Sequence, residues 1–156
     1  MFHVLFHPKR EGLSTALDNL IKHVETEYVF NIEDDWEFFG NPNFMQESLD
    51  ILEDYPKFNQ VWIRDKKDHK HPLEPYNSKF DLVLKGYQGH WGGFSFNPSL
   101  RRLEDIKQLF PNGFKEFGDE ALCSKQAEKY GYNTASLTNP AIRHIGYGRH
   151  TENFKH

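Results

Sequence analysis

The chain has 156 residues, a length that fits one domain with a substantial core and excludes two ordinary domains. Its 19 basic and 23 acidic residues give a formal net charge of -4, which argues against a general nucleic-acid binder. Aromatic residues make up 15% of the chain, so we expect large rings to fill much of the core. The single cysteine, Cys123, excludes an intrachain disulfide and predicts a reducing, cytoplasmic compartment. No apolar run is long enough to predict a transmembrane segment, and the first residues do not resemble a signal peptide.

Short apolar strands alternate with amphipathic helices along the chain. An apolar run predicts a strand at 2–6, and leucine and isoleucine residues at helical spacing predict a helix at 12–24. By the same patterns, further strands are expected at 27–32, 60–64, 81–87, 93–96, 134–137 and 141–145, and further helices at 43–55, 100–110 and 116–130. Polar residues predict a long surface loop at 65–79 and a flexible tail at 146–156. The alternation predicts a single α/β domain over 1–156, with a mainly parallel sheet flanked by helices.

Three carboxylates, Glu33, Asp34 and Asp35, come directly after the predicted strand at 27–32. In open α/β sheets, ligands bind outside the carboxyl ends of the strands. Adjacent carboxylates repel one another unless a cation or a proton joins them, and oxygen ligands of this kind suit Mg²⁺ or Mn²⁺. The run therefore predicts a metal site, with a solvated acidic turn as the alternative.

The stretch from Gly12 to Trp36 resembles the core of nucleotide-sugar-dependent glycosyltransferases of the A-type fold, particularly those like family 2. In that family a glycine, a helix rich in small residues and an apolar strand lead to an acidic DxD motif, which here has the variant form Glu33-Asp34-Asp35. The resemblance implies that Asp35 coordinates Mn²⁺ or Mg²⁺ and that Glu33 or Asp34 contacts the metal's waters or the donor ribose. It also implies a nucleotide-sugar donor and a carbohydrate acceptor.

Two later segments resemble the same family. Asp119 and Glu120 stand at the start of a predicted helix, and the resemblance implies that one of them, with Glu120 preferred, is the general base on the acceptor hydroxyl. The alternative is acidic charge that stabilises the start of a helix through its dipole. His144 resembles the late histidine that completes the metal site in several A-type enzymes, with a purely structural histidine as the alternative.

The segment 86–97 is rich in glycine and aromatic residues and resembles the part of the family that faces the acceptor. The resemblance implies acceptor contacts at Trp91, Gly92, Gly93 and Asn97. Glycine lets the backbone approach a ligand closely, and a tryptophan ring can cover the apolar face of a sugar. The alternative is a tight turn that packs Trp91 into the core.

Basic residues cluster in two places along the chain. Arg101 and Arg102 are candidates for contact with a diphosphate, because the guanidinium fork matches phosphate oxygens, although we expect at least one of them to be only a surface charge. The segment 66–71 (KKDHKH) combines lysines and histidines, but Asp68 interrupts it within a polar loop. We therefore interpret this segment as solvated surface.

Family members normally have a strand, a helix and a second strand ahead of the piece that matches 2–6. The resemblance therefore implies a truncated nucleotide-binding half, and a sheet that lacks its first strands predicts a homodimer formed through the exposed edge. The predicted function is metal-dependent and inverting glycosyl transfer. One alternative is a non-catalytic carbohydrate-binding or scaffold protein descended from a transferase, and a weaker one is a metal-dependent phosphoesterase.

Overall fold

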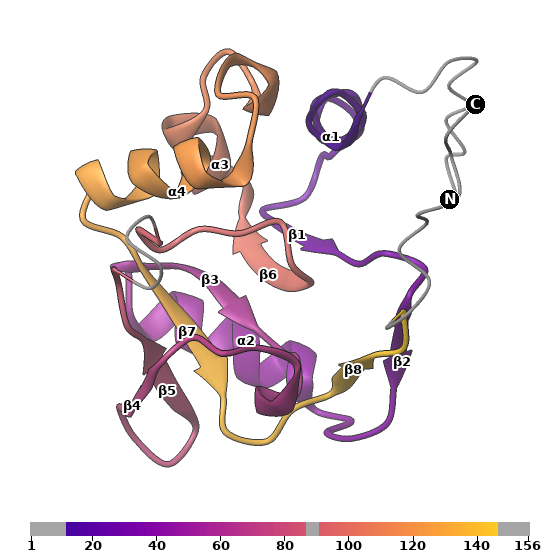
Figure 1. The fold of residues 1–156 in the computed structure, drawn as a ribbon, viewed down its shortest axis with the longest axis vertical. Coiled ribbons are helices and arrows are strands. Elements are labelled where there is room, and N and C mark those ends of the chain that lie inside the picture. Colours follow the sequence, from indigo (N-terminus) through magenta and orange to yellow (C-terminus); the bar gives the residue numbers. More distant parts are fainter. Residues whose placement is uncertain (1–11, 87–90, 147–156) are drawn as a thin grey trace.

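A mixed sheet lies at the centre of the structure (Figure 1), a computed structural model that describes residues 12–86 and 91–146. Within these residues the sheet has six strands in the order β1-β6-β3-β7-β5-β4. The strands are β1 (Tyr28–Asn31), β3 (Phe58–Trp62), β4 (Leu73–Pro75), β5 (Phe80–Val83), β6 (Ser99–Arg102) and β7 (Asn133–Leu137). A separate two-stranded sheet pairs β2 (Trp36–Phe38) with β8 (Ile142–His144).

The prediction of a mainly parallel sheet is wrong. Among the described strands of the larger sheet, only β3 and β7 pair in parallel, and the other four neighbouring pairs are antiparallel. A parallel pair needs a crossover connection, whereas an antiparallel pair needs only a turn or a returning strand. The chain supplies two such returns that the pattern does not reveal. These are β4, which forms a hairpin with β5, and β6, which runs antiparallel between β1 and β3.

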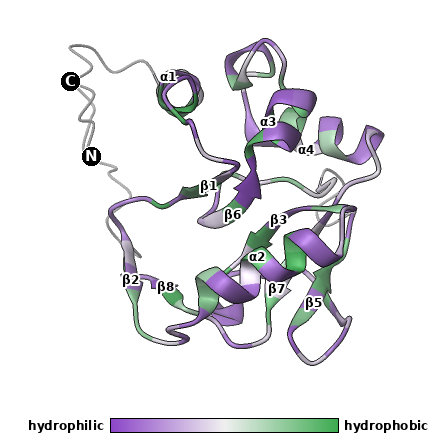
Figure 2. Cartoon of the chain, turned by 180° about the vertical axis from the view of Figure 1, so that it is seen from behind, coloured by the Kyte–Doolittle hydropathy of each residue, from purple (hydrophilic) through white to green (hydrophobic). Residues whose placement is uncertain are grey.

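Four α-helices and two short 3₁₀ turns accompany the strands in the described part of the chain. The helices are α1 (Leu13–Ile21), α2 (Phe44–Asp54), α3 (Leu103–Leu109) and α4 (Glu120–Lys129), and the turns are η1 (Lys66–Asp68) and η3 (Phe114–Glu116). In Figure 1, α2 lies behind the sheet, whereas α3 and α4 lie next to each other above β6. The helix α2 carries both hydrophobic and hydrophilic stretches (Figure 2), and its buried side chains Ile51 and Leu52 face the sheet's core.

The predicted elements agree with the structure except in a few segments. The strand expected at 2–6 and the tail beyond residue 146 lie outside the described residues. The strand expected at 93–96 is absent from the described structure, and the helix expected at 100–110 begins instead as β6 and turns into α3 at Leu103. Two strands are additional, β2 and β4, each of three residues.

Side chains, rather than a neighbouring strand, satisfy the backbone where the strand at 93–96 was expected. The Ser124 hydroxyl accepts a hydrogen bond from Gly92 N at 2.6 Å, and the Glu120 carboxylate accepts one from Phe96 N at 2.8 Å. The Thr134 hydroxyl donates to Gly93 O at 2.9 Å. These bonds from α4 and β7 take the place of a strand ladder, so the segment runs over the sheet as an irregular coil.

The core has two principal clusters on opposite faces of the sheet, and β1 shows the division. Phe30 packs against the cluster under α2, whereas its neighbour Val29 packs against the cluster under α3 and α4. The second cluster is largely aromatic and contains Phe94, Phe96, Phe110 and Phe114. The expectation of a ring-filled core is confirmed. No described helix has the length and the apolar character needed to cross a membrane.

Candidate functional site

Two residues far apart in the sequence meet at the edge of the small sheet. The Oδ2 atom of Asp35 lies 3.0 Å from Nε2 of His144, across 109 positions of the chain. Both were predicted as metal ligands. The side chain of His144 is 13% exposed and that of Asp35 is 31% exposed, so the pair is partly shielded from solvent.

The pairing of β2 with β8 holds these two side chains together. Trp36 lies opposite His144 in the antiparallel register, and their rings are 5.0 Å apart between centroids. One residue earlier, the Asp35 carbonyl accepts a hydrogen bond from Ile145 N at 2.9 Å. The His144 main-chain N–H is also held, since it donates to Asp68 Oδ2 at 2.8 Å. No pattern in the sequence predicts β2, and this short strand brings the acidic run to His144.

Gly146 provides the space that the pair occupies. A Cβ atom at this position would lie 2.8 Å from Asp35 Oδ2 and 3.0 Å from His144 Nε2, closer than side chains normally pack. Residue 146 therefore has a steric reason to be glycine. The sequence signal for this role was its place two residues after His144, but only the fold reveals the contact.

The acidic pair of Asp119 and Glu120 lies near the acidic run 33–35. Asn31, the last residue of β1, donates from Nδ2 to Phe96 O at 2.8 Å, and Phe96 N donates to Glu120 Oε2 at 2.8 Å. The raised pKa of Glu33 has burial as its largest cause, followed by the negative charge of Asp35, and the charge of Glu120 also contributes. The two acidic clusters therefore act on each other electrostatically.

The structure gives Asp119 and Glu120 different positions. Asp119 is the N-cap of α4, and its Oδ1 accepts a hydrogen bond from Leu122 N at 2.8 Å. Glu120 is exposed, and it uses Oε2 to bind Phe96 N. The capping role predicted as an alternative for this pair therefore belongs to Asp119.

Three of the four predicted acceptor contacts are positions that the core requires. Trp91 is only 4% exposed and packs against Trp62, with ring centroids 5.1 Å apart. A Cβ atom on Gly92 would collide with the carbonyl oxygen of Ser124 on α4. Gly93 has a φ of 109°, in the region that favours glycine. These residues therefore fit the alternative of a turn that is packed into the core. The buried Trp91 ring offers no open face to a sugar.

Asn97, the fourth predicted contact, lines a cavity. This cavity has a volume of about 430 Å³ and is formed by Arg64, Asn97 and the segment 67–71. The Nδ2 atom of Asn97 donates to Ser95 Oγ at 3.0 Å. Asn97 therefore remains a candidate contact for a ligand.

The arginines predicted to meet a diphosphate are held by the protein itself. Arg101 is buried, donates to Gln60 Oε1 at 3.2 Å and to the Ser95 carbonyl, and its guanidinium lies 4.9 Å from the centre of the Phe94 ring. Burial lowers the pKa of Arg101 to about 10, so it stays charged at neutral pH. Arg102 forms an ion pair with Asp105. The expectation that at least one of them is only a surface charge is therefore wrong, because both guanidinium groups are engaged within the protein.

The interpretation of 66–71 as solvated surface is wrong for its two histidines. His69 and His71 pack edge-on against the Trp62 ring, with centroids 5.2 and 5.1 Å away, and His71 lies 4.7 Å from Trp91. Both ring nitrogens of His69 are buried and have no hydrogen-bond partner among the described residues. Burial, followed by the charges of Arg64, His71 and Lys66, lowers the pKa of His69 to about 4. The sequence pattern missed this cluster because one of the two tryptophans that cover it, Trp91, lies 20 residues after His71.

His69 predicts how stability depends on pH. Because its folded pKa of about 4 lies below its ordinary value of 6.5, the unfolded chain binds a proton between these values while the folded chain does not. The destabilising effect of His69 is therefore absent above about pH 6.5. As the pH drops toward 4, the free energy of unfolding falls by about 1–2 kcal/mol, after allowance for partial exposure of the side chain. Urea unfolding of the wild type and of His69→Gln at several pH values checks this, and the variant should lose less stability over the same range. Equal losses would contradict the assignment.

Asp35 and His144 fit a divalent cation in their chemistry and spacing. Asp35 Oδ1 is buried and has no hydrogen-bond partner within the described residues, so it has lone pairs left for a ligand. Two ligands on adjacent corners of an octahedral Mg²⁺ or Mn²⁺ site lie about 3 Å apart, because each metal–ligand distance is about 2.1 Å. Across residues 12–86 and 91–146, however, no group of three or more His, Cys, Asp or Glu side chains is arranged to hold a metal ion. The protein would thus supply two ligands and leave the other positions to water or substrate oxygens.

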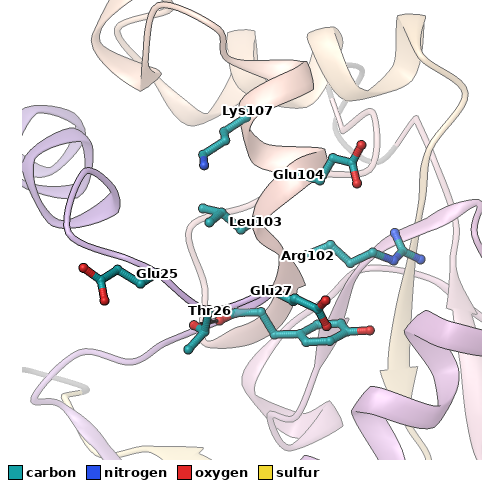
Figure 3. A pocket seen from close by; sticks show the side chains of 8 residues that line it. Glu25, Thr26, Glu27, Arg102, Leu103, Glu104 and Lys107 are labelled. Carbon is teal, nitrogen blue, oxygen red and sulfur yellow. Dashed lines mark hydrogen bonds between the residues drawn. The ribbon is translucent and has the colours of Figure 1, made fainter.

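A second cavity, of about 540 Å³, lies between the segment 25–28 and the start of α3 (Figure 3). It is next to the beginning of β1, whereas the acidic run follows the end of the same strand. Its charged side chains are mixed, with Glu25, Glu27 and Glu104 beside Arg102 and Lys107. The cavity therefore has no clear charge preference and is remote from the Asp35–His144 pair.

No protein-family model matches this chain, and no curated protein matches it in sequence.

Proposed function

We propose that this protein transfers a sugar from a nucleoside-diphosphate sugar to a hydroxyl group of a carbohydrate acceptor, with Mn²⁺ or Mg²⁺ and with inversion. The observation that carries the proposal is the contact of 3.0 Å between Asp35 and His144. The family resemblance implies these two residues as metal ligands, and they come from opposite ends of the described chain. Their contact across 109 positions of the chain supports a shared role.

The residues of the acidic run have distinct proposed tasks. Asp35 and His144 hold the cation, which when bound neutralises the negative charge that develops on the departing diphosphate. Glu33 and Asp34 stand beside Asp35 and are suited to contact the cation's waters or the ribose of the donor. Asp35 and His144 are partly shielded from solvent, so fewer water molecules would surround the cation. The electrostatic effect of the cation would be stronger for this reason.

Glu120 is the proposed general base. Its exposed carboxylate can take the proton from the acceptor hydroxyl as the oxygen attacks, while the bond from Phe96 N fixes its direction. A base on a separate element from the metal ligands favours single displacement with inversion at the anomeric carbon. Detection of product with the donor's original anomeric configuration would contradict the inverting mechanism.

Calorimetric titration with UDP-, GDP- and dTDP-sugars, each with and without Mn²⁺, tests the proposal. We expect binding of at least one of them to depend on the metal. If none binds in a metal-dependent way, the alternative of a non-catalytic carbohydrate-binding protein is preferred. That alternative relied on exposed aromatic contacts, and the burial of Trp91 weakens it. The cytoplasmic compartment and the homodimer stay predictions.

The contact of Gly146 with the metal pair gives a further prediction. Gly146→Ala is expected to weaken Mn²⁺ binding by roughly 10-fold, because the added methyl group must displace Asp35 Oδ2 or His144 Nε2. Isothermal titration with Mn²⁺ alone measures the effect. Gly118→Ala is the control, since a Cβ atom at Gly118 would meet nothing within 4 Å and the residue lies outside the pair. Its φ of 77°, which Gly146 does not share, can lower the stability of this variant but should leave its Mn²⁺ affinity unchanged. An unchanged Mn²⁺ affinity in Gly146→Ala would show that the pair does not hold the metal.

A further inference from the structure

The cavity lined by Arg64, Asn97 and the segment 67–71 is strongly basic. Lys67 and Lys70 are exposed at its rim, and neither forms an ion pair with any residue in the described part of the chain. Their neighbour Lys66 differs, because it pairs with Asp81 outside the cavity. Two lysine charges are therefore left to face whatever enters.

Arg64 adds a third positive charge at the inner wall. It is only 6% exposed, and its guanidinium lies 5.5 Å from the centre of the Trp36 ring and 5.3 Å from that of Trp62. Its Nη2 donates to the Asp68 carbonyl, which fixes the turn η1 and so the position of Lys67. A buried guanidinium between two aromatic rings is a fixed charge that does not need to be ordered when a ligand binds.

Among the described residues that line the cavity, only Asp68 carries a negative charge, and its carboxylate is engaged by the protein. Its Oδ2 accepts a hydrogen bond from the main-chain N–H of His144 at 2.8 Å. The wall thus contains three cationic side chains against one engaged carboxylate. This balance favours an anion.

His69 gives a second and independent indication. Its two ring nitrogens are buried in the cavity wall and lack a hydrogen-bond partner within residues 12–86 and 91–146. A buried polar group without a partner costs free energy, and an anion that reached an imidazole N–H after a small shift of the segment 67–71 would remove that cost. Burial, followed by the charge of Arg64, lowers the pKa of His69, and Arg64 is also one of the charges that would attract the anion.

The cavity adjoins the proposed metal pair without being part of it. Asp35 contacts the imidazole of His144, whereas Asp68 of the cavity wall contacts the main-chain nitrogen of the same residue. Asn97, which the family resemblance places on the acceptor side, belongs to the cavity wall. A donor diphosphate bound through a cation at Asp35 would therefore not occupy this cavity, which would stay available for a group of another substrate.

We propose that this basic cavity binds an anionic group of the acceptor, a sulfate, a phosphate or a carboxylate, so that the acceptor is an acidic sugar rather than a neutral one. The anion site itself follows from the cavity, whereas its assignment to the acceptor rests on the proposed function. Binding of the anion would fix the acceptor near His144 and Glu120, and would orient its hydroxyl before transfer.

Sulfate is the probe for the anion site, because it does not precipitate with Mn²⁺. Amide and imidazole NMR shifts are followed while sulfate replaces chloride at constant ionic strength. The test variant is the double substitution Lys67→Gln/Lys70→Gln, and the matched control is Lys125→Gln/Lys129→Gln, which removes the same charge from exposed positions on α4. We expect saturable shifts at His69 and Asn97, and an affinity at least about fivefold weaker in the test variant but unchanged in the control.

Two results would overturn the anion site. One is a sulfate affinity that falls equally in both double variants, which would indicate only a general effect of net charge. The other is the absence of saturable shifts at His69 in the wild type. Both lysines of the test variant are exposed, so the variant should fold, and its amide spectrum outside the cavity verifies this.

The same titration with UDP and Mn²⁺ present distinguishes the acceptor from the donor. If sulfate still binds and glucose 6-sulfate binds more tightly than glucose, the acceptor assignment is supported. If UDP with Mn²⁺ displaces sulfate competitively, the cavity holds the donor diphosphate and the acceptor assignment is overturned. If sulfate binds but none of UDP, GDP and dTDP binds with Mn²⁺, the proposed function fails while the anion site stands.

Discussion

Asp35→Ala is expected to abolish the Mn²⁺-dependent binding of a nucleotide sugar. The substitution removes the carboxylate that lies 3.0 Å from His144 Nε2, and with it one of the two protein ligands of the proposed metal site. Loss of an outer partner of a metal ligand costs roughly 10- to 100-fold in affinity, so loss of a ligand should cost more than about 100-fold. Calorimetric titration with Mn²⁺ and then with the best nucleotide sugar measures both steps.

The neighbouring carboxylate provides the control for this experiment. Asp34→Ala removes the same charge one residue away, from an exposed side chain, whereas the carboxylate that contacts His144 belongs to Asp35. We expect a loss below about 10-fold, as for a group that acts only through charge or through water. Equal losses in Asp34→Ala and Asp35→Ala would mean that the acidic run attracts cations without a defined ligand. Thermal unfolding of both variants verifies that each is folded.

Glu120→Gln is expected to remove turnover while it leaves donor binding intact. Glutamine cannot take a proton from the acceptor hydroxyl, and general base catalysis is worth about 10²–10⁴-fold in rate. The amide oxygen of glutamine can still accept the hydrogen bond from Phe96 N, so the segment around Phe96 should keep its conformation. The measurement is kcat with saturating donor and acceptor, next to the calorimetric affinity for the donor.

Asp119→Asn is the companion variant that separates catalysis from helix stability. Asparagine remains a good N-cap and can accept the bond from Leu122 N, so stability and turnover should both stay near the wild type. Asp119→Ala should lose about 1 kcal/mol of unfolding free energy through the cap and should keep its turnover. If Asp119→Asn loses turnover and Glu120→Gln does not, the base is Asp119 and our assignment is wrong.

Several features of the site follow from the sequence because they are local. A run of three carboxylates after an apolar strand is visible without a fold, and so is an acidic pair at a helix start. The helices at 13–21 and 44–54 follow from apolar residues at helical spacing, and the structure places them within three residues of the predicted bounds. Composition alone also predicted an aromatic core, which Phe94, Phe110 and Phe114 form.

Other features depend on which distant residues come together. Strand direction in β6 and the existence of β2 and β4 are set by pairing with strands elsewhere, and runs of three or four residues have no period of their own. For the same reason the pattern of residues 65–79 predicted only a loop, although it contains β4 and the histidines that pack on Trp62.

By itself the sequence determined the kinds of chemical group that this protein carries and their order along the chain. The tertiary structure decided which of them meet. Trp91, Gly92 and Gly93 suit a ligand as well as a core, and only packing against Trp62, Ser124 and β7 assigns them to the core. Asp35 and His144 suit a surface as well as a metal, and only the β2–β8 pair brings them to 3.0 Å. The physical reason is that burial and contact are properties of residues distant in sequence, whereas composition and spacing are local.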